Sequence, residues 1–123
     1  MTSVPARFGA ANLIRNKATG PRDADPLPRL LDQLAARAGR QATIERSVSR
    51  PWASALFEGR RSLIQLRLSG EGVARRADLF AQGLGEAEWT LPGHFVADIS
   101  IDARTDTDES VLFDLAALTI RDW

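Results

Sequence analysis

The stretch RPWASALFEGRRSLIQLRL, residues 50–68, decides how the middle of the chain folds. Its dipeptide Gly59-Arg60 suits a two-residue turn with glycine at the first central position. We therefore predict a hairpin of two antiparallel strands, 52–58 and 61–68. The turn fixes the register, and in this register apolar side chains oppose apolar side chains.

The predicted hairpin has two unlike faces, because successive side chains of a strand point to opposite sides. One face is apolar and should pack under helices; it holds Ala53, Ala55, Phe57, Ile64, Leu66 and Leu68. The opposite face holds Trp52, Leu56, Leu63 and Arg67, with Trp52 across from Arg67. Arginines beside an aromatic ring are found on surfaces that bind single-stranded nucleic acid, and also on hairpins that simply have one face exposed to solvent.

A helix is predicted before the hairpin and another after it. DPLPRLLDQLAARAG, residues 25–39, places apolar side chains on one helical face. Asp25 can cap this helix, Pro26 suits its first position, and Gly39 can end it in the left-handed conformation. The second helix is expected at about 72–83.

Further strands are expected at about 41–48, 86–91, 94–104 and 111–121. The resulting order is α-β-β-β-α-β-β-β, which suggests an internal duplication of residues 28–69 and 70–121. We predict an α+β fold with an antiparallel sheet of about six strands and two helices on one face. Residues 1–27, rich in proline and glycine, are read as an extended or flexible arm, and 28–123 as a single domain.

Composition narrows the classes of function. The chain has 123 residues, 44% of them hydrophobic and 26% charged, as in a soluble globular protein. It has no cysteine, which excludes disulfides, thiolate catalysis and thiolate metal sites. No apolar run approaches the length of a membrane span, so no membrane partner is expected. We expect a cytoplasmic protein with neither a metal ion nor another cofactor.

Few side chains are placed for catalysis. His94 is the single histidine, and Asp98, four residues along the same strand, lies roughly 13 Å away at the rise of a strand. The acidic run from Asp102 to Glu109 lacks the spacing of a calcium-binding loop. We predict no catalytic residue and favour a protein that is not an enzyme.

Charge is distributed unevenly along the chain. Residues 28–76 hold ten arginines and four carboxylates, a net charge of +6, whereas 77–123 hold ten carboxylates and two arginines, a net charge of −8. The acidic half would repel phosphate, so nucleic acid is an unlikely partner. A two-fold axis between two copies would lay the basic half of one on the acidic half of the other.

The outer face of the sheet is expected to carry apolar side chains that need a cover. We predict that a second copy of the chain covers them, making the protein a non-enzymatic, dimerising binding or assembly module. Two alternatives remain open: a small-molecule binder or enzyme with a pocket between sheet and helices, its ligand unknown, and a weak binder of single-stranded nucleic acid. The predicted interface residues are Trp52, Leu56, Arg61, Leu63, Arg67, Val96, Asp98, Asp102, Leu118 and Ile120.

Overall fold

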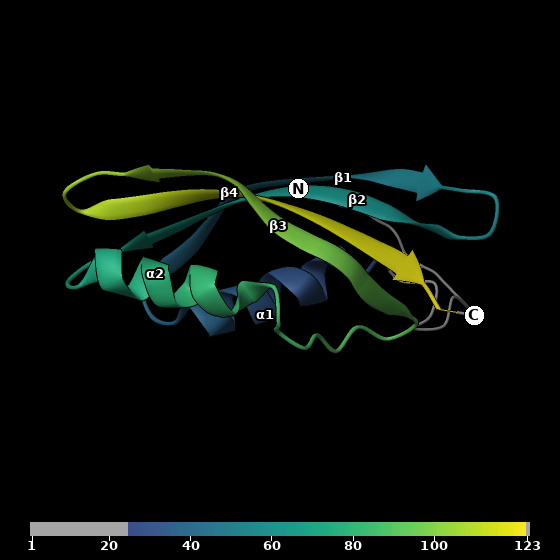
Figure 1. Cartoon of the computed structure of the whole chain (residues 1–123), viewed down its shortest axis with the longest axis horizontal. Helices are drawn as coiled ribbons and strands as arrows, with labels where there is room; N and C mark the ends of the chain where they lie inside the picture. Colours follow the sequence, from purple (N-terminus) through teal and green to yellow (C-terminus); the bar gives the residue numbers. More distant parts are fainter. Residues whose placement is uncertain (1–24, 123) are drawn as a thin grey trace, which may run out of the picture.

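The computed structural model describes residues 25–122 of the chain. Along the sequence they form α1 (Leu27–Ala38), β1 (Ala42–Ala53), β2 (Glu58–Ser69), α2 (Val73–Leu84), β3 (His94–Asp106) and β4 (Ser110–Arg121). The strands make one antiparallel sheet in the order β1-β2-β4-β3. Both helices lie on the same side of this sheet, as Figure 1 shows. The predicted α+β class with an antiparallel sheet is confirmed.

The predicted count of six strands and the α-β-β-β order are wrong. The described residues form four strands, and the element order is α-β-β repeated twice. In the first half, one strand of twelve residues, β1, joins the predicted strand 41–48 to the start of the predicted strand 52–58, and the rest of the latter is mostly turn. Charged side chains such as Arg46 and Arg50 interrupted the apolar alternation because β1 is an edge strand, where exposed charges are tolerated. Whether residues 28–69 and 70–121 arose by duplication stays a prediction.

The hairpin turn lies four residues earlier than predicted, with Ala55 and Leu56 at its centre instead of Gly59 and Arg60. The Ser54 backbone N–H donates to the Phe57 carbonyl at 2.8 Å, and the Ser54 hydroxyl accepts from the Phe57 N–H at 3.2 Å. Gly59 therefore belongs to β2, where it faces Trp52 on β1, so Trp52 does not oppose Arg67. The exposed loop between the strands takes in Leu56 and Phe57, which the prediction had placed within a strand.

The alternating segment 86–91 was expected to be a strand, and it is not one. It runs beside α1, where the Gln33 side chain takes the place of a neighbouring strand. The Gln33 amide donates to the Thr90 carbonyl at 2.7 Å, and its oxygen accepts from the Thr90 N–H at 2.9 Å. Leu91 is buried and Trp89 packs against the core, so the alternation reflects packing on the helix layer.

Two bulges in β3 change which side its residues face. The register with β4 shifts between Val96 and Asp98 and again between Ile101 and Ala103. Each bulge inserts one extra residue and so reverses the alternation. As a consequence Val96 packs against the core on the helix side, and its prediction as an outer-face residue is wrong.

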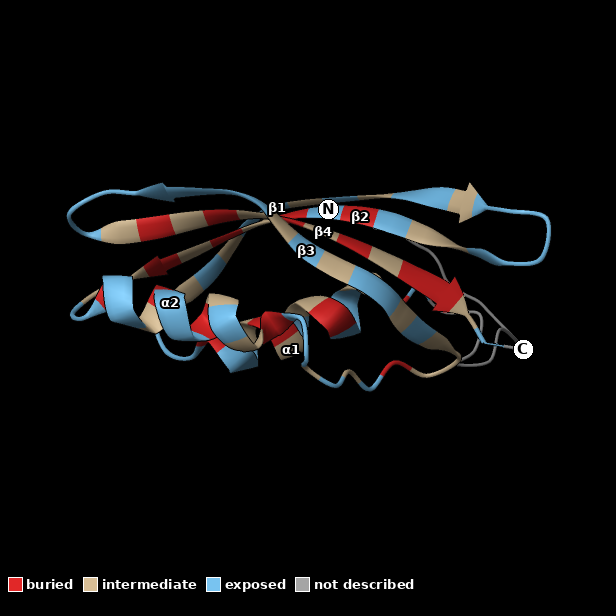
Figure 2. Cartoon of the chain, viewed as in Figure 1, coloured by how far each residue is buried: buried red, intermediate tan, exposed pale blue. Residues whose placement is uncertain are grey.

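The core fills the space between the sheet and the helices. Figure 2 shows buried residues concentrated on β2, β4 and the inner sides of both helices. The rings of Phe80 on α2 and Phe113 on β4 lie 5.3 Å apart, centroid to centroid. The buried strand residues are Ser62, Ile64, Leu66, Leu68, Val111, Phe113, Leu115, Ala117, Thr119 and Ile120.

The helix ends follow the sequence signals. The Asp25 carboxylate accepts from the Leu27 N–H at 3.0 Å, and Gly39 ends α1 with φ of 92°. Arg76 on α2 donates to the Ser69 carbonyl at 2.6 Å and to the Arg40 carbonyl, which ties α2 to the end of β2 and to the start of β1. Except for residues 25–27, the predicted N-terminal arm lies outside the described residues.

Candidate functional site

The sheet has one face that no described helix covers, and we call it the open face. Along β2 the side chains alternate, so that Ile64 and Leu66 point to the helices and Leu63 and Gln65 point away. The same alternation runs along β4, and neighbouring strands keep it in register. By register the open face comprises Thr43, Arg46, Val48, Arg50, Trp52, Gly59, Arg61, Leu63, Gln65, Arg67, Phe95, Asp98, Ser100, Ala103, Thr105, Leu112, Asp114, Ala116, Leu118 and Ile120.

Apolar side chains cross the middle of the open face. Val48, Leu63 and Ala116 are direct neighbours on β1, β2 and β4, and Leu118 follows on β4. We call these four residues the apolar stripe. Leu63 on the central strand β2 is 47% exposed, and Val48 beside it on the edge strand β1 is 40% exposed. The stripe borders a hollow of about 330 Å³, so this face has relief into which a partner's side chains can fit.

Arginines gather on the β1–β2 side of the open face. Arg50 and Arg61 lie directly opposite each other in the register, and Arg46 follows on β1. Within residues 25–122 none of these three forms an ion pair, whereas Arg67 pairs with Glu45 at 3.5 Å. Like charges placed side by side on a sheet repel each other, and a bound partner with carboxylates would relieve this.

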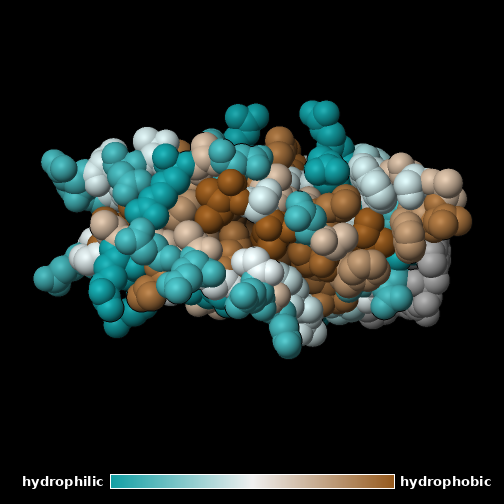
Figure 3. Space-filling model, viewed as in Figure 1, coloured by the Kyte–Doolittle hydropathy of each residue, from teal (hydrophilic) through white to brown (hydrophobic). Residues whose placement is uncertain are grey.

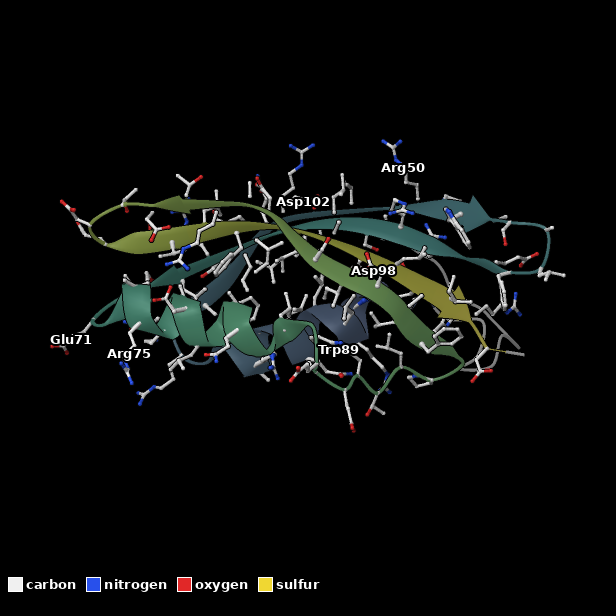
Figure 4. All side chains as sticks on the ribbon, in the orientation of Figure 1. Arg50, Glu71, Arg75, Trp89, Asp98 and Asp102 are labelled. Carbon is white, nitrogen blue, oxygen red and sulfur yellow. The ribbon has the colours of Figure 1, made fainter. Side chains whose placement is uncertain are left out.

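Aspartates gather on the β3–β4 side of the same face. Asp114 on β4 accepts a hydrogen bond from Gln65 at 3.0 Å, and Asp102 accepts one from Ser100 at 3.5 Å. Asp98, next to Leu118, has no ion-pair partner among the described residues. Figure 4 shows Arg50 pointing away from the helices, with Asp98 and Asp102 on β3. The open face is thus basic along one side, apolar in the middle and acidic along the other side.

Most of the predicted interface residues meet on this face, although the predicted hairpin was wrong. Leu56 is 78% exposed in the loop between β1 and β2, and Val96 belongs to the core. Ile120 has open-face register but is buried. The predicted interface omitted Val48, Arg50 and Ala116. Val48 and Arg50 join this face only because β1 runs unbroken from Ala42 to Ala53. The predicted residues brought together are Trp52, Arg61, Leu63, Arg67, Asp98 and Leu118, with Asp102 beside them at the β3 bulge.

The edges of the sheet are poorly suited to pairing with a further strand. β1 has a bulge at Glu45 and carries Pro51, which lacks the backbone N–H that a new strand would need. β3 has two bulges. Proteins commonly use such features to prevent edge-to-edge association of sheets. A partner of this sheet would therefore bind its open face more readily than its edges.

A second hollow, of about 470 Å³, lies where α1 begins and the sheet ends. It is lined by Trp52, Arg60, His94 and Arg121 together with Asp25 and Glu58. Its arginines already face carboxylates, since Arg60 lies 3.9 Å from Asp25 and Arg121 lies 3.9 Å from Glu58. The imidazole Nδ1 of His94 lies 3.2 Å from the Pro92 carbonyl oxygen. The charges of this hollow are thus largely satisfied within the chain.

On the helix side, Arg104 connects β3 with α2. Its guanidinium donates two hydrogen bonds to Asp106, at 2.8 and 3.0 Å, and one to Asp78 at 2.8 Å, and it lies over the ring of Phe113. These hydrogen bonds, those to Asp106 first, raise the pKa of Arg104 above its ordinary value. In turn the hydrogen bonds from Arg104 lower the pKa of Asp106. This cluster stabilises the fold and leaves the open face untouched.

Residues 25–122 contain no group of three or more His, Asp or Glu side chains placed to hold a metal ion. Among the described helices, none is long and apolar enough to cross a membrane.

Figure 3 shows further apolar side chains in the band between the sheet and the helices, which belongs to the core layer.

Fold and surface together define a two-layer α+β protein with one charge-divided sheet face that no helix among residues 25–122 covers. Comparison of the chain with protein-family models, with curated proteins and with solved structures finds no match.

Proposed function

We propose that the chain is a non-enzymatic binding or assembly module that forms a homodimer through the open face of its sheet. The observation that carries the proposal is the apolar stripe. On one side of it lie arginines that form no ion pair within the described part of the chain, and on the other side lie aspartates. Exposed apolar groups of this size favour burial against a partner. A partner must also be acidic opposite the arginines and basic opposite the aspartates.

A second copy of the chain meets both electrostatic requirements. It offers the same apolar stripe, and its acidic side can oppose Arg46, Arg50 and Arg61. A nucleic acid would meet only the first requirement, since Asp98 and Asp102 would repel phosphate. Charge complementarity of this kind sets the orientation of partners and raises the rate of association more than it raises affinity.

The size of the open face also suits a dimer. Four strands of about twelve residues cover roughly 19 by 40 Å, or roughly 760 Å², at ordinary strand spacing and rise. A standard protein–protein interface buries about 800 Å² on each partner. The stripe would supply most of the association free energy, at about 25 cal/mol per Å² of apolar surface before the entropic cost of association.

The test is the solution mass of the purified chain, measured by light scattering over a range of concentrations. We expect a dimer for the wild type and a monomer for Leu63→Asp. The matched control is Leu79→Asp, because Leu79 on α2 is 56% exposed and lies away from the open face. Val48→Lys provides a second disruptive variant on an edge strand, where lysine is well tolerated.

Circular dichroism establishes that each variant is folded before its mass is interpreted. A folded wild type that stays monomeric at high concentration contradicts the proposal. So does a dimer that survives both Leu63→Asp and Val48→Lys, because the interface would then lie elsewhere.

A further inference from the structure

We infer that the two copies pack face to face about a two-fold axis that runs parallel to the central strands β2 and β4. This inference rests on the proposed dimer and specifies which residues meet within it. It follows from the order of charged and apolar residues across the sheet, which the strand register fixes.

Two rows of open-face residues cross all four strands, and the order of side chains in these rows distinguishes the possible axes. The charged row runs from β1 to β3 through Arg50, Arg61, Leu118 and Asp98. The apolar row beside it runs through Val48, Leu63, Ala116 and Ser100. The charged row is therefore basic on β1 and β2 and ends with an aspartate on β3. The apolar row is bulky on β1 and β2 and small on β4 and β3.

An axis parallel to the strands places each row over the same row of the second copy, which runs in the opposite direction across the sheet. β1 then lies over β3 of the second copy, and β2 lies over β4 of the second copy. Arg50 meets Asp98 of the second copy twice in the dimer, once on each side of the axis. In the apolar row, Leu63 meets Ala116 of the second copy, so a large side chain packs against a small one, as dense packing requires.

An axis perpendicular to the strands, also in the plane of the interface, gives the opposite result. Every strand would then lie over itself, and the basic strands β1 and β2 would face their own copies. With the apolar row on the axis, Arg50 would lie over Arg46 of the second copy, and Asp98 would lie near Asp102 of the second copy. Like charges would meet on both sides, which disfavours this arrangement.

The twist of packed sheets leaves the favoured contacts within reach. Packed sheets lie about 10 Å apart and turn by about 30° relative to each other. The outer strands lie about 7 Å from the axis at ordinary strand spacing, so the turn displaces Arg50 along the strand by only about 4 Å. The long arginine side chain spans this offset to reach Asp98 of the second copy.

Charge reversal tests the axis. Arg50→Asp would replace two Arg–Asp contacts in the dimer by two Asp–Asp contacts, so we expect its dissociation constant to rise about tenfold or more. Asp98→Arg should have a similar effect, and the double variant should return the constant to within about threefold of the wild type. The control is Arg75→Asp on α2, which Figure 4 shows far from the open face and which should leave the dimer unchanged.

Chemical crosslinking gives an independent readout, because the chain has no cysteine of its own. Sheets about 10 Å apart are too distant for a disulfide, so a short bismaleimide crosslinker is used. A mixture of Arg50→Cys and Asp98→Cys chains should form a covalent heterodimer. A mixture of Arg50→Cys and Arg46→Cys chains should not.

The possible outcomes distinguish failure of the proposed axis from failure of the proposed dimer. A wild-type dimer that links through Arg50→Cys and Arg46→Cys, and that Arg50→Asp strengthens, overturns the axis while the proposed function stands. A monomeric wild type overturns both. A dimer with the expected reversal and crosslinking pattern supports both.

Discussion

Gly59 of β2 lies so close to β4 that a Cβ atom at this position would sit 1.9 Å from the Thr119 carbonyl oxygen. The obstacle is backbone, which cannot move aside as a flexible side chain can. Glycine is thus required here for close approach of two central strands, although the sequence suggested that it served a turn.

Gly59→Ala should therefore destabilise the fold by about 2 kcal/mol, because the sheet has to shift to admit one methyl group. Urea denaturation followed by circular dichroism measures the change. The matched control is Gly85→Ala, at the end of α2, where φ is −69° and nothing lies within 4 Å of the added Cβ. Equal stability of the two variants would show that the β2–β4 contact is less tight than described.

Phe113 is the largest fully buried side chain of the core and touches both layers. It packs against Phe80 on α2, and the Arg104 guanidinium lies 5.6 Å from its ring centroid. Phe113→Ala should lower the free energy of unfolding by about 3–5 kcal/mol, through lost burial and the cavity left behind. Phe57→Ala, in the exposed loop between β1 and β2, should change it by no more than about 0.5 kcal/mol.

The sequence was most informative where local patterns match the final environment. Helix spacing and end signals located α1 and α2 within a residue or two, since Asp25 and Gly39 act where they stand. Alternation on β2 assigned Leu63 and Arg67 to the correct face despite the wrong turn. Successive side chains of a strand point to opposite faces. A turn that moves by an even number of residues therefore leaves each side chain on the same face.

The errors arose where tertiary contacts override the local pattern. Nothing in the alternation of 86–91 reveals that Gln33, more than fifty residues away, satisfies its backbone. The sequence also gives no sign of the bulge after Val96, although this bulge turns Val96 to the helix side, where it packs against the core. The sequence was therefore enough to predict that the candidate site has a basic side and an acidic side, and to identify some of its residues. Which residues lie side by side across the sheet follows only from the strand register.

The Arg104–Asp106 pair predicts a pH dependence of stability. The hydrogen bonds from Arg104 lower the pKa of Asp106 in the folded state relative to the unfolded state, where it is about 4. The pair therefore stabilises the fold above about pH 4, and this contribution is lost as the pH falls through the lowered pKa. Arg104 stays charged throughout this range.

Asp106→Asn removes the titrating group and keeps its shape. The stability difference between wild type and Asp106→Asn should be constant from about pH 7 to pH 5 and should shrink below about pH 4. Thermal unfolding at a series of pH values measures it. Asp108→Asn, in the neighbouring loop, is the control; a difference that grows on acidification would contradict the assigned role of Arg104.

The Gln33–Thr90 pair should hold the segment 86–91 against α1. Gln33→Ala removes both hydrogen bonds, at 2.7 and 2.9 Å, and should cost about 1 kcal/mol at this exposed position. Alanine also favours the helix slightly, so the control is Gln82→Ala at an exposed position of α2, where the same gain in helix propensity occurs without lost bonds. Hydrogen exchange locates the effect: the Thr90 amide, freed from the Gln33 oxygen, should exchange faster in Gln33→Ala and at the wild-type rate in Gln82→Ala. If Thr90 exchanges equally in both, another contact positions this segment, and Gln33 does not replace a strand partner.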